Sequence, residues 1–347
     1  MNKKEILDLL NCKNEPEALY AKAREVRNST IGNYVYLRGL IEISDICRKD
    51  CYYCGIRRSN TKAERYTVSK EDIVAIAVTA WEKEFGSVVL QGGERNDDEY
   101  VTWIEDVLRS IKEATRNELG ITLSLGEQTE DTYKRWFDAG AHRYLLRIET
   151  SNETLYNRLH PNDNVHSFAT RLEALHNLQK VGYQTGSGVM IGLPFQTLDN
   201  LADDLLFLRS SDIDMVGMGP YLEHEDTPLY VCRNELLSLS ERLQLSLRMI
   251  AVLRLLVPDL NIASTTALQS IDPQGREKGL LAGANVIMPN MTPVNDRRKY
   301  RLYQNKPFSE ESTDKQIGIL SKNITDCGCR IALNQWGDPQ HFKNRRK

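Results

Sequence analysis

The chain has 347 residues, of which 41% are hydrophobic and 27% charged, and its formal net charge is −3. This balance is ordinary for a globular protein with a substantial core, and a slightly acidic chain has no general affinity for nucleic acid or anionic membranes. No run approaches the roughly 18 apolar residues of a membrane span, and residues 1–5 lack the apolar segment of a secretion signal, so we expect a cytoplasmic protein.

The first 32 residues predict a helical extension, because apolar residues such as Ile6 and Leu19 alternate there with Lys, Glu and Arg. Residues 33–43 form a largely apolar run that predicts a strand. A cysteine-rich segment, residues 47–54, follows this strand directly. It is therefore expected on the loop at the strand's C-terminal end.

From residue 69 onward, predicted helices and strands alternate. Apolar residues every three or four positions indicate helices, and short apolar runs indicate strands. Ser69 is a predicted N-cap, and Gly140 and Gly182 are predicted helix stops. The predicted helices cover residues 69–85, 99–118, 129–139, 153–159, 168–180, 198–209 and 239–256, and the further predicted strands cover 87–91, 120–125, 143–149, 184–192, 214–219, 261–265 and 284–288.

Eight β–α alternations over roughly 260 residues match a parallel barrel in count and length. The predicted fold class is α/β, a single (β/α)8 TIM barrel at residues 33–300. Residues 1–32 are expected as an N-terminal helical extension, and residues 301–347 as a C-terminal extension with a helix and a short strand that packs on the barrel. A doubly wound open sheet is the alternative, but no G-x-G-x-x-G turn follows the first strand.

Three cysteines, Cys47, Cys51 and Cys54, stand in a C-x3-C-x2-C segment. A closed zinc site needs four protein ligands, and the next His and Cys are distant, at His142 and Cys232. A disulfide framework usually has an even number of cysteines, and this chain has seven. Three thiolates suit a four-iron cluster in which one iron stays open to a small molecule. Bound zinc and inert thiols remain the alternative interpretations.

With Tyr53 before its last cysteine, the segment resembles the cluster motif of the radical S-adenosylmethionine (SAM) enzymes. In that superfamily the open iron of a [4Fe-4S] cluster takes the amino and carboxylate groups of SAM. An electron from the cluster then cleaves SAM and releases a 5′-deoxyadenosyl radical. The resemblance implies both cofactors and a reductant protein that supplies the electron.

Polar residues also follow other predicted strands, at the end where a barrel carries its active site. Residues 91–94 contain two glycines, which allow close backbone approach to a ligand but also suit a tight turn. They resemble the superfamily's GGE segment, which meets the SAM amino group. Arg147 and Glu149 share one side of a strand by alternation. Burying two charged side chains inside a barrel is costly unless they bind a ligand or form an ion pair. The hydroxyls of residues 264–266 suit a small anion, or a helix cap.

Longer segments resemble one family, HydE, the radical SAM maturase of [FeFe]-hydrogenase. The similarity runs from about residue 34 to 306. Biotin synthase and the methylornithine synthase PylB share the barrel and part of the pattern. The resemblance implies assembly of the hydrogenase di-iron site from an iron–cysteine complex bearing CO and cyanide. The segments that carry it are residues 122–127, 143–147, 216–220, 226–229, 263–267 and 283–290.

The resemblance also implies a role for each matching residue. Cys47, Cys51 and Cys54 would hold the cluster. The expected SAM contacts are Tyr53, Gln91, Gly92, Gly93, Glu94, Ser124, Glu149, Arg171 and Met288. The small-molecule site would be lined by Thr122, Arg147, Thr265 and Thr266, with Met215, Tyr300 and Tyr303 nearby.

The sequence departs from the family at two places. Many HydE sequences have His where this chain has Ile148, and alternation puts that residue on the side away from Arg147, so we expect altered packing only. Some members carry a second iron–sulfur cluster held by three cysteines near the C-terminus. This chain has only Cys327 and Cys329 there, so no second cluster is expected.

Three functions stay open from the sequence: a HydE-like maturase acting on an organometallic substrate, an amino-acid mutase of the PylB kind, and a catalytically silent metal-binding barrel. Arg147, Thr265 and Thr266 would serve an amino-acid carboxylate as readily as a cysteine-bound iron complex. The segments at 122–127 and 283–290 favour HydE. Expected partners are a small-molecule or organometallic substrate, a reductant protein and other hydrogenase maturases, with neither nucleic acid nor membrane.

Overall fold

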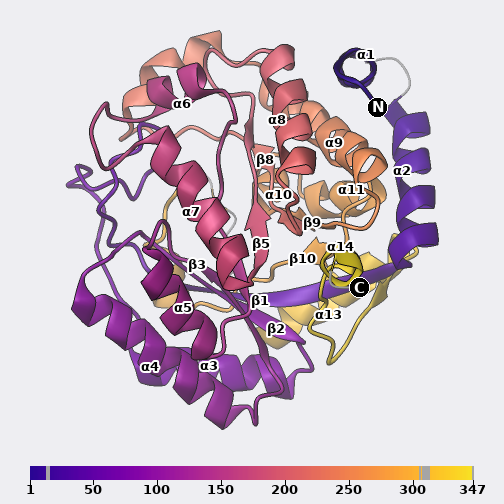
Figure 1. Ribbon diagram of the computed structural model, residues 1–347. Coiled ribbons are helices and arrows are strands. Elements are labelled where there is room, and N and C mark those ends of the chain that lie inside the picture. Colours follow the sequence, from indigo (N-terminus) through magenta and orange to yellow (C-terminus); the bar gives the residue numbers. More distant parts are fainter. Residues whose placement is uncertain (13–15, 305, 307–312, 346–347) are drawn as a thin grey trace.

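The computed structural model describes residues 1–12, 16–304, 306 and 313–345. Its centre is a closed barrel of eight parallel strands surrounded by helices (Figure 1). The last strand closes on the first through the pairs Tyr36–Val286 and Leu37–Ile287. The predicted (β/α)8 TIM barrel is therefore confirmed. Its strands are β1 (Tyr34–Ser44), β2 (Ser87–Gly92), β3 (Gly120–Ser124), β4 (Arg143–Leu145), β5 (Gln184–Ser187), β7 (Met215–Val216), β9 (Asn261–Ser264) and β10 (Val286–Ile287).

The surrounding helices begin largely at side-chain caps that the sequence provides. Ser69, Asp97, Thr129 and Ser167 each accept a hydrogen bond from a first-turn N–H, which satisfies a donor that the helix itself leaves unpaired. The helices are α3 (Lys70–Glu82), α4 (Asp98–Ala114), α5 (Glu130–Asp138), α6 (Glu153–Leu159), α7 (Phe168–Val181), α8 (Leu198–Ser210) and α9 (Leu239–Leu256). None of the helices in the described part of the chain is long and apolar enough to cross a bilayer.

The N-terminal helices lie outside this ring, where α1 (Lys3–Asn11) contacts α8 and α2 (Pro16–Ile31) contacts α9 (Figure 1). Four helical segments were not predicted, because each is short and follows a strand or loop without a clear apolar period. They are η1 (Pro228–Glu235), α10 (Thr266–Ile271), α11 (Gly275–Leu281) and α12 (Val294–Arg297).

Four predicted strands are clearly shorter than expected, and one of them, predicted at 284–288, covers only Val286–Ile287. β4 ends at Leu145, and the predicted strands at 184–192 and 214–219 are each divided in two. The division lies where Gly188 faces Gly217 so closely that a Cβ on Gly188 would be 1.9 Å from the Gly217 carbonyl oxygen. The second halves, β6 (Met190–Ile191) and β8 (Gly219–Pro220), form a separate two-stranded ladder above the barrel. Both strands are therefore interrupted where these two glycines are in contact. A pattern of apolar periodicity does not predict such a contact.

The C-terminal part contains α13 (Thr313–Asp326), β11 (Arg330–Ile331) and α14 (Gln340–Arg345). β11 pairs with the start of β1, which is the end of the barrel opposite the cysteine loop. The following residues close that end, because the fully buried Arg143 donates from Nη1 to the Trp336 carbonyl at 2.6 Å and lies 3.1 Å from the Asp338 carboxylate. The mouth at the other end is thereby left as the entrance to the barrel.

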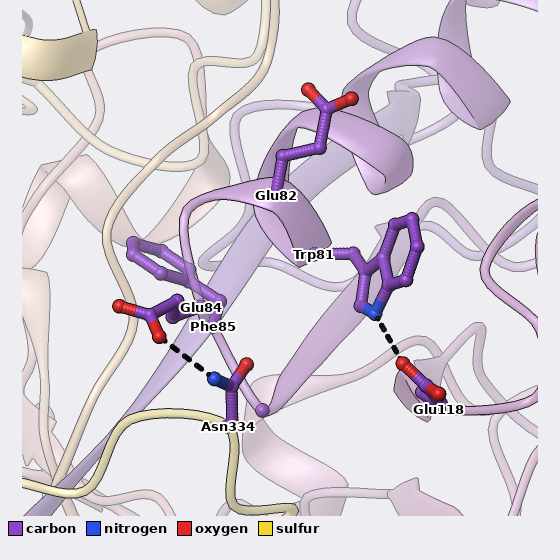
Figure 2. Close-up of a pocket in the computed structure, with 7 residues that line it drawn as sticks. Trp81, Glu82, Glu84, Phe85, Glu118 and Asn334 are labelled. Atoms are coloured by element: carbon purple, nitrogen blue, oxygen red, sulfur yellow. Dashed lines mark hydrogen bonds between the residues drawn. The ribbon is translucent and has the colours of Figure 1, made fainter.

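A wide surface depression also lies at this closed end, beside the starts of β2 and β3 (Figure 2). Trp81 donates from Nε1 to Glu118 at 3.1 Å, and Asn334 donates from Nδ2 to Glu84 at 2.9 Å. The second contact fastens the C-terminal segment to the barrel, and the first joins α3 to the residues before β3. The depression is at the wrong end for the cysteine loop, and we assign it no function.

Candidate active site

Cys47, Cys51 and Cys54 lie on the loop between β1 and α3, at the C-terminal end of β1 where the sequence placed them. The loop is joined to the loop after β2 by backbone contacts. The Arg48 N–H donates to the Glu94 carbonyl at 2.8 Å, and the Glu94 N–H lies 3.3 Å from the Cys47 sulfur. The cysteines are therefore held at the barrel mouth by a neighbouring βα loop.

The three thiols share one desolvated environment. Burial raises the pKa of each, that of Cys51 to about 12, and the charge of Cys47 raises the pKa of Cys51 further. Burial also raises the pKa of the Cys54 thiol, and the charges of Cys51 and Cys47 raise it further. Thiolates at such a place are stable only when a metal compensates their charge. Three mutually repelling thiols with no fourth ligand are the donor set that an iron–sulfur cluster uses. Among the described residues, no three His, Cys, Asp or Glu side chains converge as they would on a single metal ion.

Gly93 allows the loop after β2 to pack against the cysteine loop. A Cβ on Gly93 would lie 2.3 Å from the Ile46 carbonyl oxygen and 2.8 Å from the Cys47 Cβ, so no larger residue fits without moving the loop. At Gly92 the nearest atoms would be 3.3 Å away, a much milder contact. Glycine is therefore required at position 93 because two loops pack closely there, and not only because the chain turns.

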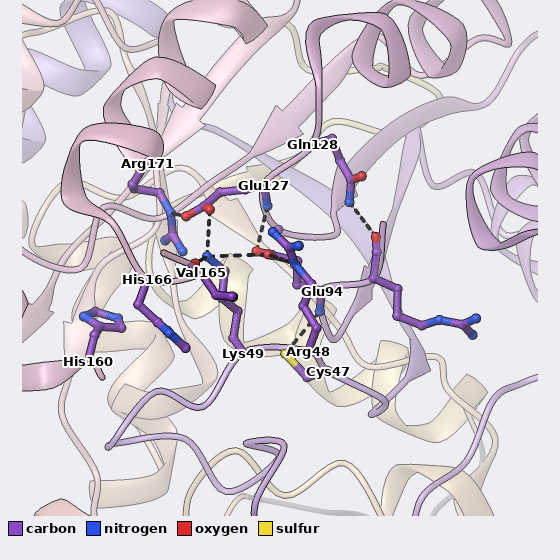
Figure 3. Close-up of polar contacts among 12 residues, drawn as sticks. Cys47, Arg48, Lys49, Glu94, Glu127, Gln128, His160, Val165, His166 and Arg171 are labelled. Carbon is purple, nitrogen blue, oxygen red and sulfur yellow. Dashed lines mark hydrogen bonds and ion pairs between the residues drawn. The ribbon is translucent and has the colours of Figure 1, made fainter. Parts of the chain in front are cut away.

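Glu94, which the sequence placed at the SAM amino group, is occupied by contacts within the protein. Its side chain is 4% exposed, and one carboxylate oxygen lies 2.8 Å from Arg48 Nε and 3.5 Å from Lys49 Nζ. The other oxygen accepts the Glu127 N–H at 2.8 Å. Glu94 thus holds the cysteine loop to the loops after β2 and β3 (Figure 3).

Behind the cysteine loop, Lys49, Glu127 and Arg171 form a buried ion network (Figure 3). Lys49 Nζ lies 2.7 Å from Glu127 Oε2 and also donates to the Val165 carbonyl. Arg171 donates from Nε to the other Glu127 oxygen and from Nη1 to the Arg147 carbonyl. Burial alone would raise the pKa of Glu127, but the charges of Arg171 and Lys49 outweigh it and lower that pKa. Glu127 is therefore ionised and ties the motif's lysine to α7.

Two histidines also anchor the cysteine loop. His160 Nδ1 lies 2.8 Å from the Tyr156 carbonyl, so Nδ1 carries the proton and Nε2 accepts from the Tyr53 hydroxyl at 3.1 Å. His166 Nε2 accepts the Asp50 N–H at 2.8 Å, while its Nδ1 lies 2.7 Å from Asp163. Burial lowers the pKa of His160 to about 3, so it is neutral. Neither histidine was predicted, because both come from the region after β4, far from the cysteine loop along the chain.

Arg147 and Glu149 meet, but not in the way that strand alternation predicted. β4 ends before them, and Glu149 has φ +66°, in the left-handed region. Arg147 Nη2 lies 2.9 Å from Glu149 Oε2 and donates to the Val189 carbonyl at 3.1 Å. Arg147 Nε has no hydrogen-bond partner among the described residues. The ion pair between Arg147 and Glu149, which the sequence analysis gave as the alternative to a functional role, is present. The buried Nε–H of Arg147 remains as a donor for a ligand. Ile148 is fully buried in the core, as expected from its side of the chain.

The remaining predicted residues surround the barrel interior. Thr122, Met215 and Met288 line one narrow cavity within the barrel. Thr122 Oγ1 accepts from Arg143 Nε at 3.1 Å, and Met215 Sδ lies 3.0 Å from Arg38 Nη1. Ser124 is next to Gln91 in the β2–β3 register. The cavity therefore gathers side chains from β3, β7 and the end of β10 beneath the mouth.

Thr265 and Thr266 lie at the mouth, above this cavity, where β9 leads into α10. Thr265 is the N-cap residue of α10 but makes no side-chain capping bond, so capping does not account for its hydroxyl. Thr266 Oγ1 accepts from Arg276 Nη2 at 3.1 Å, and Arg276 was not predicted. Arg276 Nε also has no partner among the described residues. A second arginine thus joins Arg147 near the predicted small-molecule site.

A strap formed by residues 299–304 crosses the barrel mouth after α12. Tyr300 is 2% exposed, and its hydroxyl lies 3.4 Å from Gln91 Nε2. The Leu302 carbonyl accepts the Gly55 N–H at 2.9 Å, and the Gln304 N–H donates to the Glu223 carbonyl at 2.9 Å. Lys306, just beyond, pairs with Glu42, which is 1% exposed. The strap brings Tyr300 and Tyr303 to the barrel mouth, and their place near the substrate stays a prediction.

Cys327 and Cys329 lie between α13 and β11, at the closed end of the barrel. They are separated from the cysteine loop by the length of β1.

Comparison with known proteins gives a consistent result. Residues 41–208 match the family model described as the radical SAM superfamily. The chain is 46% identical over 322 residues to the [FeFe] hydrogenase maturase subunit HydE of Thermotoga maritima, covering 92% of this chain and 88% of the relative. It is 31% identical to the 3-methylornithine synthase of Methanosarcina acetivorans, covering 93% and 87%. The crystal structure of methylornithine synthase (PylB) superposes with a TM-score of 0.77 at 25% identity, covering 96% of this chain and 94% of that one.

Proposed function

The chain belongs to the radical SAM superfamily, in the group that includes HydE and 3-methylornithine synthase, and from this premise we propose that it matures [FeFe]-hydrogenase. It is an enzyme whose cofactors are a [4Fe-4S] cluster and SAM. The observation that carries the proposal is 46% identity to a [FeFe] hydrogenase maturase subunit over 92% of the chain, with the cysteine loop intact at the barrel mouth.

The proposed chemistry begins at the cysteine loop. When bound, the cluster supplies the electron that converts SAM to methionine and a 5′-deoxyadenosyl radical. Cys47, Cys51 and Cys54 are the proposed ligands, because they share one loop at the barrel mouth, where burial raises the pKa of each thiol and a bound metal would hold it as the thiolate. The proposed SAM contacts are Tyr53, Gln91, Gly92, Gly93, Glu94, Ser124, Glu149, Arg171 and Met288, of which Glu94 and Arg171 also hold the loop through internal ion pairs.

The proposed substrate is an iron–cysteine complex bearing CO and cyanide, bound beneath SAM in the barrel. Arg147, whose Nε is unpartnered among the described residues, would bind its carboxylate together with the Thr265 and Thr266 hydroxyls. Thr122, Met215, Tyr300 and Tyr303 would line the rest of the site. These residues would orient the complex so that its cysteine sulfur faces the radical that SAM supplies when bound. A reductant protein and other maturases are the proposed partners.

A cytoplasmic setting fits this chemistry. All seven cysteines are free thiols, and thiols persist in a reducing compartment. We therefore place the enzyme in the cytoplasm, where the cluster ligands would stay available to iron.

An amino-acid mutase of the PylB kind is the second candidate. It is favoured by 31% identity across most of both chains and by the similar barrel. The substrate residues do not separate the two, since an amino-acid carboxylate would fit Arg147 and the threonines equally well.

The test starts from anaerobically reconstituted protein, which is expected to hold about four irons per chain and to cleave SAM when reduced with dithionite. The reconstituted protein is then added to a hydrogenase-maturation extract that lacks HydE. Restored hydrogenase activity supports the maturase. Intact SAM cleavage without restoration, together with methylornithine formation from lysine, would favour the mutase. Stoichiometric zinc with no 5′-deoxyadenosine would contradict both.

Arg147→Ala is expected to impair substrate use far more than cluster assembly. Hydrogen bonds to a charged group contribute about 1.5–3 kcal/mol, so substrate affinity should fall roughly 10- to 150-fold. The iron content and the rate of SAM cleavage without substrate should stay near those of the wild type. Measuring iron content and 5′-deoxyadenosine alongside hydrogenase maturation separates an effect on substrate use from an effect on cluster assembly. A variant that loses its iron would show that Arg147 supports the cluster instead.

A further inference from the structure

Positive charge is concentrated in two segments that surround the cysteines. Residues 47–66 contain six Arg or Lys against two Asp or Glu, and residues 297–306 contain five against none. The net charges are thus +4 and +5, so the rest of the chain, whose total is −3, carries −12. Part of this charge is neutralised inside the protein, where Arg48 pairs with Glu94, Lys49 with Glu127 and Lys306 with Glu42, and the exposed cations carry the rest.

The two segments lie side by side at the barrel mouth. The Gly55 N–H donates to the Leu302 carbonyl at 2.9 Å, and a Cβ on Gly55 would be 2.1 Å from the Arg301 carbonyl oxygen. Lys299 Nζ lies 3.6 Å from Glu64. His224 lies against the loop, since a Cβ on Gly55 would be 2.4 Å from its Cδ2, and the neighbouring acid Asp226 pairs with Lys62. The loop and the strap thus form one continuous surface.

Four cations of this surface are exposed: Arg58, Lys62, Arg298 and Arg301, which we call the basic rim. Lys62 is 75% exposed at its side chain and pairs with Asp226 at 2.5 Å. Arg58 and Arg301 form no ion pair with any residue that the structure describes, and Arg301 donates only from Nε to the Arg298 carbonyl at 3.0 Å. Two arginines therefore keep their full charge for a partner.

The basic rim is joined directly to the cluster ligands. The Arg58 N–H donates to the carbonyl of Lys49, which stands between Cys47 and Cys51, at 2.8 Å. On the strap, the Arg301 backbone touches Gly55, the residue after Cys54. A protein bound on the rim would therefore lie beside the loop that carries the three cysteines.

We propose that the basic rim is the docking surface for a small acidic electron-carrier protein that reduces the cluster. The inference rests on the proposed function, because only a radical SAM enzyme requires that electron. Charge complementarity selects an acidic partner, because Arg58 and Arg301 are exposed at this surface and form no ion pair among the described residues. Nucleic acid is disfavoured, since the rim is a compact group of four side chains in a net acidic chain.

This arrangement makes association fast and dependent on salt. Complementary charges at a rim steer encounter and chiefly change the association rate. The effect weakens as the screening length falls from about 10 Å at 0.1 M salt to about 3 Å at 1 M. Binding to the rim should therefore be tight at low ionic strength and weak at high ionic strength.

The test measures binding of oxidised flavodoxin, an acidic one-electron carrier, to the cluster-loaded enzyme by calorimetry. The variant is Arg58→Glu with Arg301→Glu, and the milder variant is Arg58→Gln with Arg301→Gln. The matched control is Lys4→Glu with Arg330→Glu, which makes the same change in charge at exposed positions on α1 and β11. Each protein is measured at 50 mM and 500 mM NaCl.

The double Glu variant should bind flavodoxin at least about tenfold more weakly at low salt, with the Gln variant intermediate and the control near wild type. All four should converge at high salt. SAM cleavage driven by dithionite should be unchanged in every variant, whereas cleavage driven by reduced flavodoxin should slow in the Glu variant.

Equal affinity of the Glu variant and the control would overturn the docking surface, as would tighter binding of a duplex oligonucleotide than of flavodoxin. Failure of the proposed function gives a different result, because the wild type would then bind flavodoxin through the rim but would not restore hydrogenase activity in the extract that lacks HydE. Should the Glu variant lose its cluster, the Gln variant decides the question by its affinity.

Discussion

Gly55→Ala is expected to reduce both the iron content and SAM cleavage severely, the latter by about 100-fold or more, since a displacement of 1 Å at a reacting centre can cost that much. Gly55 follows Cys54 directly, and an added Cβ would lie 2.1 Å from the Arg301 carbonyl oxygen and 2.4 Å from His224 Cδ2. The first of these atoms is backbone, so the methyl group can be accommodated only by moving the strap or the cysteine loop. Either movement breaks the Gly55–Leu302 hydrogen bond.

Iron per chain after anaerobic reconstitution, and 5′-deoxyadenosine formed under dithionite, measure the two effects. Gly318→Ala is the matched control, because a Cβ there meets nothing within 4 Å and the residue lies within α13. Alanine in place of a helical glycine should be neutral or stabilise by about 0.5–1 kcal/mol. A Gly55→Ala protein with normal iron and normal cleavage would show that the strap yields easily and plays no part in holding the cysteine loop.

The barrel could be predicted because its signals are local. Each strand is a short apolar run, and helix starts such as Ser69 and Thr129 carry their own caps. The place of Cys47–Cys54 follows from the same order, since the loop after the first strand lies at the mouth of any such barrel. Thr265, at the end of β9, reaches the mouth for the same reason, whereas Thr122 lies in the cavity beneath it.

What could not be predicted depends on contacts between distant segments. Lys49 meets Glu127 across 78 residues, and Lys306 meets Glu42 across 264. No pattern in the sequence indicates such pairs, because their partners are chosen by the packing of βα loops. Glu149 illustrates the same limit on a smaller scale: alternation placed it beside Arg147, yet the contact arises from a left-handed residue after the strand has ended. The GGE segment was assigned to SAM, and only the structure reveals that Glu94 is also held by Arg48 and Lys49.

The buried network behind the cysteine loop leads to the second large effect, at Glu127. Glu127→Gln is expected to destabilise the protein by about 3–5 kcal/mol, the usual cost of removing one partner from a buried ion pair. Lys49 and Arg171, with side chains 4% and 8% exposed, would lose the carboxylate they share. Since Lys49 stands between two cluster cysteines, the variant should also retain less iron. Urea denaturation followed by circular dichroism gives the stability of the cluster-free protein, and iron analysis gives retention.

The pH dependence of this loss distinguishes charge from packing. Burial raises the pKa of Glu127, but Arg171 and Lys49 outweigh it, so the folded pKa lies below the ordinary value of about 4.3 in the unfolded chain. A carboxylate with a lowered pKa contributes its full stability above the unfolded pKa and loses it as pH falls through the folded pKa. The difference between wild type and Glu127→Gln should therefore be constant from pH 7 to about pH 5 and shrink below about pH 4.3, because a protonated glutamic acid is as neutral as glutamine.

Glu105→Gln is the control for this experiment, because Glu105 also pairs with two cations, Arg109 and Arg135, but at the surface with 21% of its side chain exposed. Its loss should be at most about 1 kcal/mol. Equal losses at positions 105 and 127 would mean that the buried network contributes no more than a surface pair. A Glu127→Gln difference that persists undiminished below pH 4 would assign the loss to packing rather than to charge. The expected result, a large loss that disappears in acid together with loss of iron, would identify the Lys49–Glu127–Arg171 network as the support that fixes the cysteine loop in place before any cofactor binds.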